Sequence, residues 1–191
     1  MKGGRTKEAV IETALQMAIA DGLEGLTFGT LSKQAGLSKS GLFAHFSSKT
    51  DLQLSVLDHA LGLFRTDVIA AGTKAEPGLE RLRVLYSKYL DWIAGTCSVS
   101  ADPFAGFVQE FDGRPGELRE KLVTSQTEWR NQLTRNVRKS QSENKQLRQD
   151  PPDQIAFELI GAAQSFQVAL NLLDDDTARE KADAAFDSIL S

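Results

Sequence analysis

Apolar residues recur at helical spacing along almost the whole chain. The first stripe, at positions i, i+3, i+4 and i+7, consists of Ile11, Ala14, Leu15 and Ala18. Asp21-Gly22 ends this segment. Similar spacing between breakers predicts further helices over residues 27–35, 38–46, 47–72, 79–93, 101–111, 117–144, 153–173 and 174–190. No segment shows the alternation typical of a strand, so we predict an all-α fold of about nine helices.

Two of the predicted helices are short and are separated by Gly36. Residues 31–46 have the order helix, glycine-containing turn, helix, which is the arrangement of a helix-turn-helix. Ser38, Leu42 and Phe46 fall on one face of the second helix. We expect that face to pack inward.

The opposite face of this second helix carries an unusual set of residues. Ser40, Phe43 and Ala44 point away from the inward face, and Lys39 lies on its flank. Such a set is suited to a DNA major groove, where it can bind phosphates and base edges and contact a thymine methyl group. The pattern therefore indicates a DNA-reading helix.

The stretch from Leu26 to Leu57 resembles the DNA-binding domain of the TetR family of transcriptional regulators. Members of the family show a Thr that opens the second helix, an A-G-V/L-S turn, an L-Y/F-x-H-F recognition helix and an S/K-K-x-x-L start to the fourth helix. The matching residues are Thr27, Ala35-Gly36-Leu37-Ser38, Leu42-Phe43-Ala44-His45-Phe46 and Ser48-Lys49 followed by Leu52. Phe43 replaces the commoner Tyr, which removes a hydroxyl that could reach a phosphate. Beyond the first four helices the resemblance is only architectural.

Eight residues are assigned to contact with double-stranded DNA on these grounds. They are Thr27, Ser38, Lys39, Ser40, Gly41, Phe43, His45 and Lys49. Lys49 begins a helix, where backbone N–H groups and the helix dipole already favour a phosphate. A solvated lysine is the alternative for Lys49 and a structural histidine is the alternative for His45, whereas Thr27 caps a helix whether or not it also contacts a phosphate.

The family resemblance implies two domains and a ligand-responsive function. We expect a helix-turn-helix DNA-binding domain over residues 1–50 and a helical ligand-binding and dimerisation domain over residues 51–191. The protein would be a transcriptional regulator, most simply a repressor, that binds a pseudo-palindromic operator as a homodimer and is released by a small molecule. The rival hypothesis is a helical ligand-binding or protein-interaction module that keeps the fold without operator binding.

Aromatic residues of the predicted second domain indicate an apolar effector pocket. The candidate lining residues are Tyr86, Tyr89, Trp92, Phe104, Phe107, Phe111, Trp129 and Phe166. Pockets for small molecules are mostly apolar with a few placed polar groups. For each of these residues taken singly, an ordinary place in the core is the alternative.

The last two predicted helices are candidates for the dimer interface. Residues 155–173 are apolar around most of the helix, and Gly161-Ala162-Ala163 would allow another helix to approach closely. The candidate interface residues are Ile155, Leu159, Gly161, Ala162, Ala163, Phe166, Leu170, Ala178, Ala182 and Phe186.

Charge is distributed unevenly over a chain whose formal net charge is −4. Residues 1–50 carry six Lys and Arg against four acids, and residues 51–191 carry sixteen against twenty-two. The net charge is therefore +2 over residues 1–50 and −6 over residues 51–191, and this difference favours different binding partners for the two parts.

The sequence offers no set of residues for catalysis, a metal or a cofactor. Two histidines and one cysteine supply neither metal-ligand spacing nor a nucleophile with its base. Asp174–Asp176 are explained by the start of a helix. Lone Cys97 forms no internal disulfide and fits a reducing cytoplasm, and an ordinary thiol is the alternative to a redox sensor. Without a signal peptide or a long apolar run, we expect a cytoplasmic protein that does not span a membrane.

Overall fold

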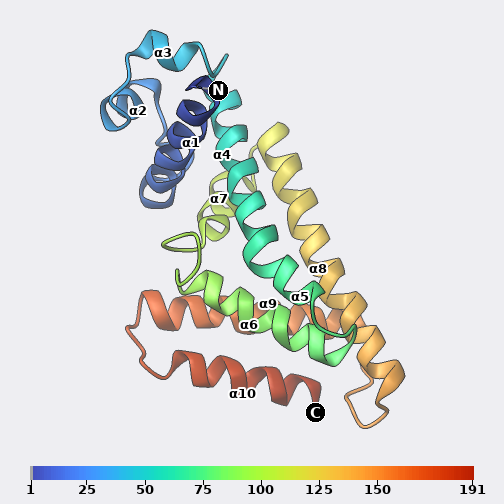
Figure 1. The fold of residues 1–191 in the computed structure, drawn as a ribbon. Coiled ribbons are helices and arrows are strands. Elements are labelled where there is room, and N and C mark those ends of the chain that lie inside the picture. The colour runs from blue at the N-terminus through green and yellow to red at the C-terminus, as the bar shows by residue number, and fades with distance from the viewer. Residues whose placement is uncertain (1) are drawn as a thin grey trace. The chain divides into compact units, whose positions relative to one another are not determined.

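The computed structural model describes residues 2–191, with side chains from residue 7 onward (Figure 1). Its elements are α1 (Lys2–Asp21), α2 (Phe28–Gln34), α3 (Lys39–Phe43), α4 (Lys49–Phe64), the π-helical η1 (Arg65–Ile69), α5 (Ala70–Thr73), α6 (Leu79–Ile93), α7 (Pro103–Phe111), α8 (Glu117–Glu143), α9 (Pro152–Asn171) and α10 (Ala178–Leu190). The described residues form no strand, and the predicted all-α class is confirmed.

The helix predicted over residues 47–72 is divided into α4, η1 and α5. The backbone widens at η1, where the N–H of Ala70 bonds to the carbonyl oxygen of Arg65. Gly72 then allows α5 to lie close to α6, because a Cβ at this position would come within 2.4 Å of a methyl carbon of Leu85. The sequence shows the apolar spacing of this segment but not the local change in helix type.

The chain forms two compact units. The first contains residues up to Leu63 together with Val99–Thr124, and the second contains Phe64–Ser98 and Ser125–Ser191. These units do not coincide with the predicted domains 1–50 and 51–191, because most of α4 and all of α7 pack in the same unit as the helix-turn-helix.

The helix predicted over residues 38–46 is shorter in the structure, where α3 ends at Phe43, but the core of the first unit confirms most of its inward face. Leu42 and Phe46 are fully buried, as are Leu15 of α1 and Leu31 of α2. Ser38 was expected on this face, but it is exposed. This part of the prediction is wrong because Ser38 lies before the helix and caps it, accepting a hydrogen bond from the N–H of Gly41 at 3.1 Å.

The second unit is built on the paired helices α9 and α10, which lie side by side in Figure 1. Tyr86 of α6 packs against Phe186 of α10 with ring centroids 5.0 Å apart. Arg179 of α10 donates to Asp91 Oδ1 at 2.7 Å and to Ser87 Oγ at 2.8 Å, both on α6. Apolar packing and an ion pair thus hold α10 against α6.

The helix predicted from residue 174 begins four residues later. Asp174 has φ +49°, and Asp175 Oδ1 accepts hydrogen bonds from the N–H and hydroxyl of Thr177. These acids therefore form the turn that precedes α10 instead of its first turn. No helix among the described residues is long and apolar enough to cross a membrane.

Candidate nucleic-acid interface

Side-chain caps fix the starts of α2 and α3. Thr27 Oγ1 accepts a hydrogen bond from the N–H of Thr30 at 3.1 Å, and Thr30 Oγ1 accepts one from the N–H of Thr27 at 3.3 Å. This reciprocal pair is a capping box. Gly36 has φ +66°, a conformation that favours glycine, and it turns the chain from α2 toward α3. The sequence signals at these positions therefore specify the local geometry directly.

The predicted DNA-contact residues on and just after α3 differ in their exposure to solvent. Lys39, Ser40 and Phe43 are exposed, whereas Gly41 and His45 are half-buried. The Oγ atoms of Ser38 and Ser40 lie 3.0 Å apart and share a hydrogen bond. This arrangement presents a cation, hydroxyl groups and an aromatic ring within five consecutive helical residues.

Gly29 of α2 lies beside the end of the Lys39 side chain. A Cβ at Gly29 would lie 3.7 Å from Cε and 3.8 Å from Nζ of Lys39, both ordinary van der Waals distances. The Lys39 side chain therefore runs along the start of α2. A glycine costs helix stability at such a position, by roughly 1 kcal/mol relative to Ala.

Lys49 is held in place at the start of α4. Its Nζ donates to the main-chain oxygen of Glu24 at 2.7 Å and to Glu24 Oε2 at 3.1 Å. The hydrogen bond from Lys49 is the main cause of the lowered pKa of Glu24, to which Arg114 also contributes at 3.3 Å. An ammonium group has three hydrogens, so one N–H of Lys49 remains for another acceptor.

The candidate pocket residues fall into several groups. Tyr89, Trp92 and Trp129 meet in the second unit, together with Phe64, which the sequence analysis had not included. Phe64 lies edge-on to Trp92 and to Trp129 with both centroid distances 5.3 Å, and Tyr89 lies 5.1 Å from Trp129. Trp129 is only 5% exposed, and its Nε1 has no hydrogen-bond acceptor.

The other candidate pocket residues lie elsewhere. Phe104, Phe107 and Phe111 are buried on α7 in the first unit. Tyr86 belongs to the contact between α6 and α10, where burial raises the pKa of its hydroxyl to about 12. Phe166 faces α10. The sequence analysis grouped these residues because they are aromatic and belong to the predicted second domain, and residue type carries no information about which of them meet.

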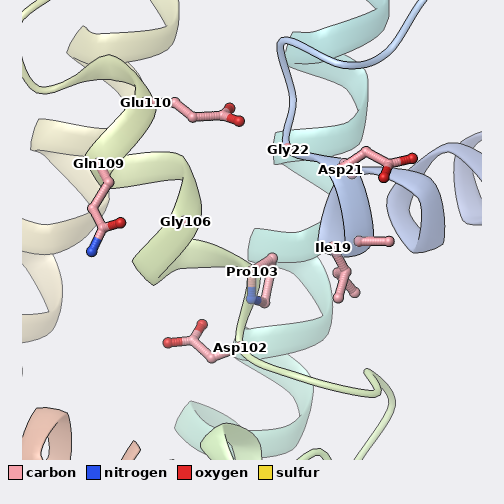
Figure 2. Close-up of a pocket in the computed structure, with 10 residues that line it drawn as sticks. Ile19, Asp21, Gly22, Asp102, Pro103, Gly106, Gln109 and Glu110 are labelled. Atoms are coloured by element: carbon pink, nitrogen blue, oxygen red, sulfur yellow. The ribbon is translucent and has the colours of Figure 1, made fainter. Parts of the chain in front are cut away.

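A cavity of about 400 Å³ lies between the end of α1 and α7, within the first unit (Figure 2). Its polar lining consists of Asp21, Asp102, Gln109 and Glu110. Glu110 points from α7 toward Gly22, whereas Gln109 points away from it (Figure 2). The sequence analysis did not find this site, because its two walls are about eighty residues apart in the chain.

Most of the candidate dimer residues are buried within the single chain. Those with at most 4% exposure are Ile155, Leu159, Ala163, Phe166, Ala178, Ala182 and Phe186. Gly161 is exposed, and Ala162 and Leu170 are half-buried. The apolar surface that remains open on and just after α9 consists of Phe157, Val168, Leu172 and Leu173.

A shallow groove of about 150 Å³ runs between α9 and α10 beside this open surface. Apart from Phe166, Ser165 and Lys181, its lining consists of the alanines Ala162, Ala169, Ala178, Ala182 and Ala185. Such small side chains allow close approach by another helix.

Comparison with known proteins gives a consistent result for both halves of the chain. Residues 10–56 match the family described as "Bacterial regulatory proteins, tetR family". Residues 78–186, more than half of the chain, match "Tetracyclin repressor-like, C-terminal domain". No curated protein matches this sequence.

Solved structures share the fold over nearly their whole length. A TetR transcriptional regulator from Chloroflexus aurantiacus is 21% identical with TM-score 0.83, covering 98% of this chain and 93% of its own. SCO4454, a TetR-family transcriptional regulator from Streptomyces coelicolor, is 18% identical with TM-score 0.81 and coverages of 97% and 94%. AibR in complex with isovaleryl coenzyme A and operator DNA is 19% identical with TM-score 0.78 and coverages of 97% and 98%.

Proposed function

The chain belongs to the TetR family of bacterial regulatory proteins, and we propose that it is a repressor that binds its operator as a homodimer and leaves it when a mostly apolar effector binds. The membership confirms the resemblance found in the sequence and makes the protein a transcriptional regulator with a helix-turn-helix DNA-binding domain. In a two-fold dimer, two α3 helices would enter major grooves about one helical turn, roughly 34 Å, or a multiple of it apart.

The exposed surface of α3 is the observation that carries the DNA-binding proposal. Phe43 is 55% exposed and lies beside the cation of Lys39 and the hydroxyl of Ser40. An apolar ring with this much exposure gains free energy when a partner covers it. The neighbouring positive charge and the net charge of +2 over residues 1–50 favour DNA over an apolar protein partner.

The open surface of α9 supports the homodimer. Phe157 on α9 is 68% exposed, and Leu172, just after the helix, is 74% exposed. The alanine-lined groove between α9 and α10 continues this surface. Interfaces between helices typically pack large apolar side chains against small ones. A second copy of this chain would offer its large exposed residues to the alanine-lined groove and its own groove to the exposed residues of the first copy.

The aromatic cluster of the second unit supports an apolar effector. Phe64, Tyr89, Trp92 and Trp129 provide apolar contact area, and the unpaired N–H of Trp129 would favour an effector that carries an acceptor. AibR binds isovaleryl coenzyme A, in which a small apolar acyl group with a carbonyl oxygen is joined to a phosphorylated coenzyme. To lower the fraction of dimers able to bind the operator from 99% to 1%, the effector must bind the released conformation more tightly than the operator-binding conformation by about 5.5 kcal/mol.

Operator binding can be tested by fluorescence anisotropy with the DNA upstream of the protein's own gene. We expect wild type to prefer this DNA to an unrelated duplex, with an affinity that falls as salt rises. Lys49→Ala should weaken binding to all sequences and reduce the log–log salt slope by about 0.9, the value for one phosphate contact. Lys74→Ala, at an exposed lysine in the second unit, is the matched control.

Two results would contradict the proposal. Absence of DNA binding by wild type would favour the rival hypothesis of a module without operator binding. An unchanged affinity and salt slope in Lys49→Ala would show that α4 does not contact the DNA backbone through this lysine.

A further inference from the structure

Besides a local bond from the N–H of Leu26 to the carbonyl oxygen of Leu23 at 3.3 Å, the turn between α1 and α2 has hydrogen bonds to residues far away in the chain. Glu110 Oε2, on α7, accepts from the N–H of Leu23 at 2.9 Å and from the N–H of Glu24 at 3.3 Å. Gln53 Nε2, on α4, donates to the carbonyl oxygen of Leu23 at 2.8 Å. Lys49 Nζ, also on α4, donates to the carbonyl oxygen of Glu24 at 2.7 Å.

Both peptide N–H groups and both carbonyl groups of Leu23 and Glu24 are therefore bonded to side chains of α4 and α7. Backbone groups outside regular helices need such partners, because an unmet buried group costs free energy. Gln53 is almost completely buried, so its bond fixes the turn against the core. Lys49 and Glu110 are the two members of this set that solvent can reach.

The backbone at Gly22 fits closely around Glu110. Gly22 has φ +79°, and a Cβ there would lie 1.6 Å from Glu110 Oε1. Any side chain at this position would displace the carboxylate. The glycine at the end of α1 therefore serves two purposes: it reverses the chain, and it admits the carboxylate of α7.

Glu24 connects the α7 carboxylate to the lysine at the DNA interface. Its N–H bonds to Glu110, its carbonyl oxygen accepts from Lys49, and its side chain forms ion pairs with Lys49 and with Arg114. Hydrogen bonds in such a chain polarise one another and strengthen together. A single residue, Glu24, therefore links Glu110 to Lys49.

We propose that Glu110 is a positioning residue for DNA binding, which holds the Leu23–Glu24 turn in the form that places Lys49 at the DNA backbone. This inference rests on the proposed operator binding. It extends the DNA-binding machinery to α7, outside the residues that resemble the family's DNA-binding domain. Glu110 lines the cavity of Figure 2 and is half-buried, so we expect the core of the first unit to stay folded when this residue is replaced.

The test compares three variants of the full chain for operator affinity and salt slope. Glu110→Ala removes both acceptor contacts and should weaken binding several-fold, with a slope lower by up to about 0.9, the share of one phosphate. Glu110→Gln keeps one acceptor oxygen and should restore part of the affinity. Gln109→Ala, the neighbouring residue that lines the same cavity and points away from Gly22, should behave as wild type.

A double-mutant cycle separates positioning from a general structural effect. In a Lys49→Ala background, Glu110→Ala should cause little further loss of affinity, because the residue that it positions is already absent. Amide hydrogen exchange should be faster at Leu23 and Glu24 in Glu110→Ala and unchanged in helices away from the turn.

Distinct outcomes overturn the inference and the proposed function. If wild type binds the operator and Glu110→Ala keeps both its affinity and its slope, the inference is wrong and operator binding stands. Additive losses in the double-mutant cycle also overturn it, since they mean that Glu110 does not act through Lys49. If wild type binds no DNA, the proposed function fails and the inference fails with it.

Discussion

Phe43 of α3 lies against Phe28 of α2, with ring centroids 4.3 Å apart and ring planes inclined at 31°. Phe28 is the first residue of α2 and Phe43 is the last of α3, so the pair connects opposite ends of the helix-turn-helix. Contact with Phe28 limits the positions open to the Phe43 ring, and half of that ring still faces solvent. A ring that is already fixed loses less entropy when it enters a groove.

This geometry predicts that Phe43 contributes to the choice of operator sequence. An apolar ring in the major groove contacts thymine methyl groups, and a good base contact discriminates by roughly 1–3 kcal/mol. Phe43→Ala should therefore reduce the preference between operator variants that differ at one thymine. Binding measured by anisotropy against a panel of single-base variants checks this.

Phe28→Leu is the matched control for the same panel. It keeps an apolar neighbour beside Phe43 and should retain the preference, at some loss of affinity. A uniform loss over all variants in Phe43→Ala would show that the ring contributes to affinity without reading a base.

The pKa of Glu24 provides a second prediction, on pH. It is lowered from an ordinary 4.5, first of all by the hydrogen bond from Lys49. A carboxyl group whose pKa is lower in the folded state contributes stability that is present above pH 4.5 and is lost as pH falls through the lowered value. Lys49→Ala should move the pKa of Glu24 up toward 4.5.

An NMR titration of the Glu24 side-chain carboxyl carbon measures this shift. Lys39→Ala, which removes another lysine of the helix-turn-helix but no bond to Glu24, is the control. An unchanged pKa in Lys49→Ala would mean that the two groups are not paired in solution, and the positioning of Lys49 would lose its basis.

The helix-turn-helix could be predicted from the sequence because its signals are local. Thr27 and Ser38 cap helices within three residues of themselves, and Gly36 adopts the left-handed conformation that its residue type favours. The bond from Leu23 to Glu110 spans 87 positions and has no local signal. It depends on the packing of α7 against α1, which periodicity does not encode.

Helix α9 shows a second limit of sequence patterns. Its apolar residues surround the helix, and the sequence analysis attributed the excess to a second copy. The structure shows that Ile155, Leu159 and Ala163 pack inside their own chain and that Phe157 and Leu172 remain exposed. Apolar character predicts that a face is covered, but it does not distinguish the partner within the chain from the partner outside it.

A third prediction therefore places the test of dimerisation at an exposed residue. Leu172→Glu adds a charge to the open surface of α9 without disturbing the core, and two copies would bring like charges together across a two-fold axis. Sedimentation at micromolar concentration should show a shift from dimer toward monomer. Val123→Glu, at an exposed apolar residue of α8, is the control and should leave the assembly unchanged.

Either of two results would contradict the proposed interface. A monomeric wild type under the same conditions would rule out a stable homodimer. A dimer that tolerates Leu172→Glu as well as it tolerates Val123→Glu would place the interface elsewhere.

The fourth prediction concerns the buried indole N–H of Trp129. An unpaired donor away from water costs about 1–3 kcal/mol, so an effector that offers an acceptor at this point recovers that free energy on binding. Between two apolar compounds of the same shape, such as a ketone and the matching hydrocarbon, the ketone should raise the melting temperature further. Trp129→Phe should remove this difference while keeping an aromatic ring in the cluster.

Spectroscopy can locate the bond, because the chain has two tryptophans. In a Trp92→Phe background the indole signal comes from Trp129 alone, and its Raman bands should show a new hydrogen bond when the ketone binds. The same ketone should lower operator affinity.

A compound that stabilises the protein and leaves operator affinity unchanged would reveal a pocket without a switch. If only phosphorylated or carboxylated compounds bind, the effector site is not apolar, and the assignment of Trp129 as its donor is wrong.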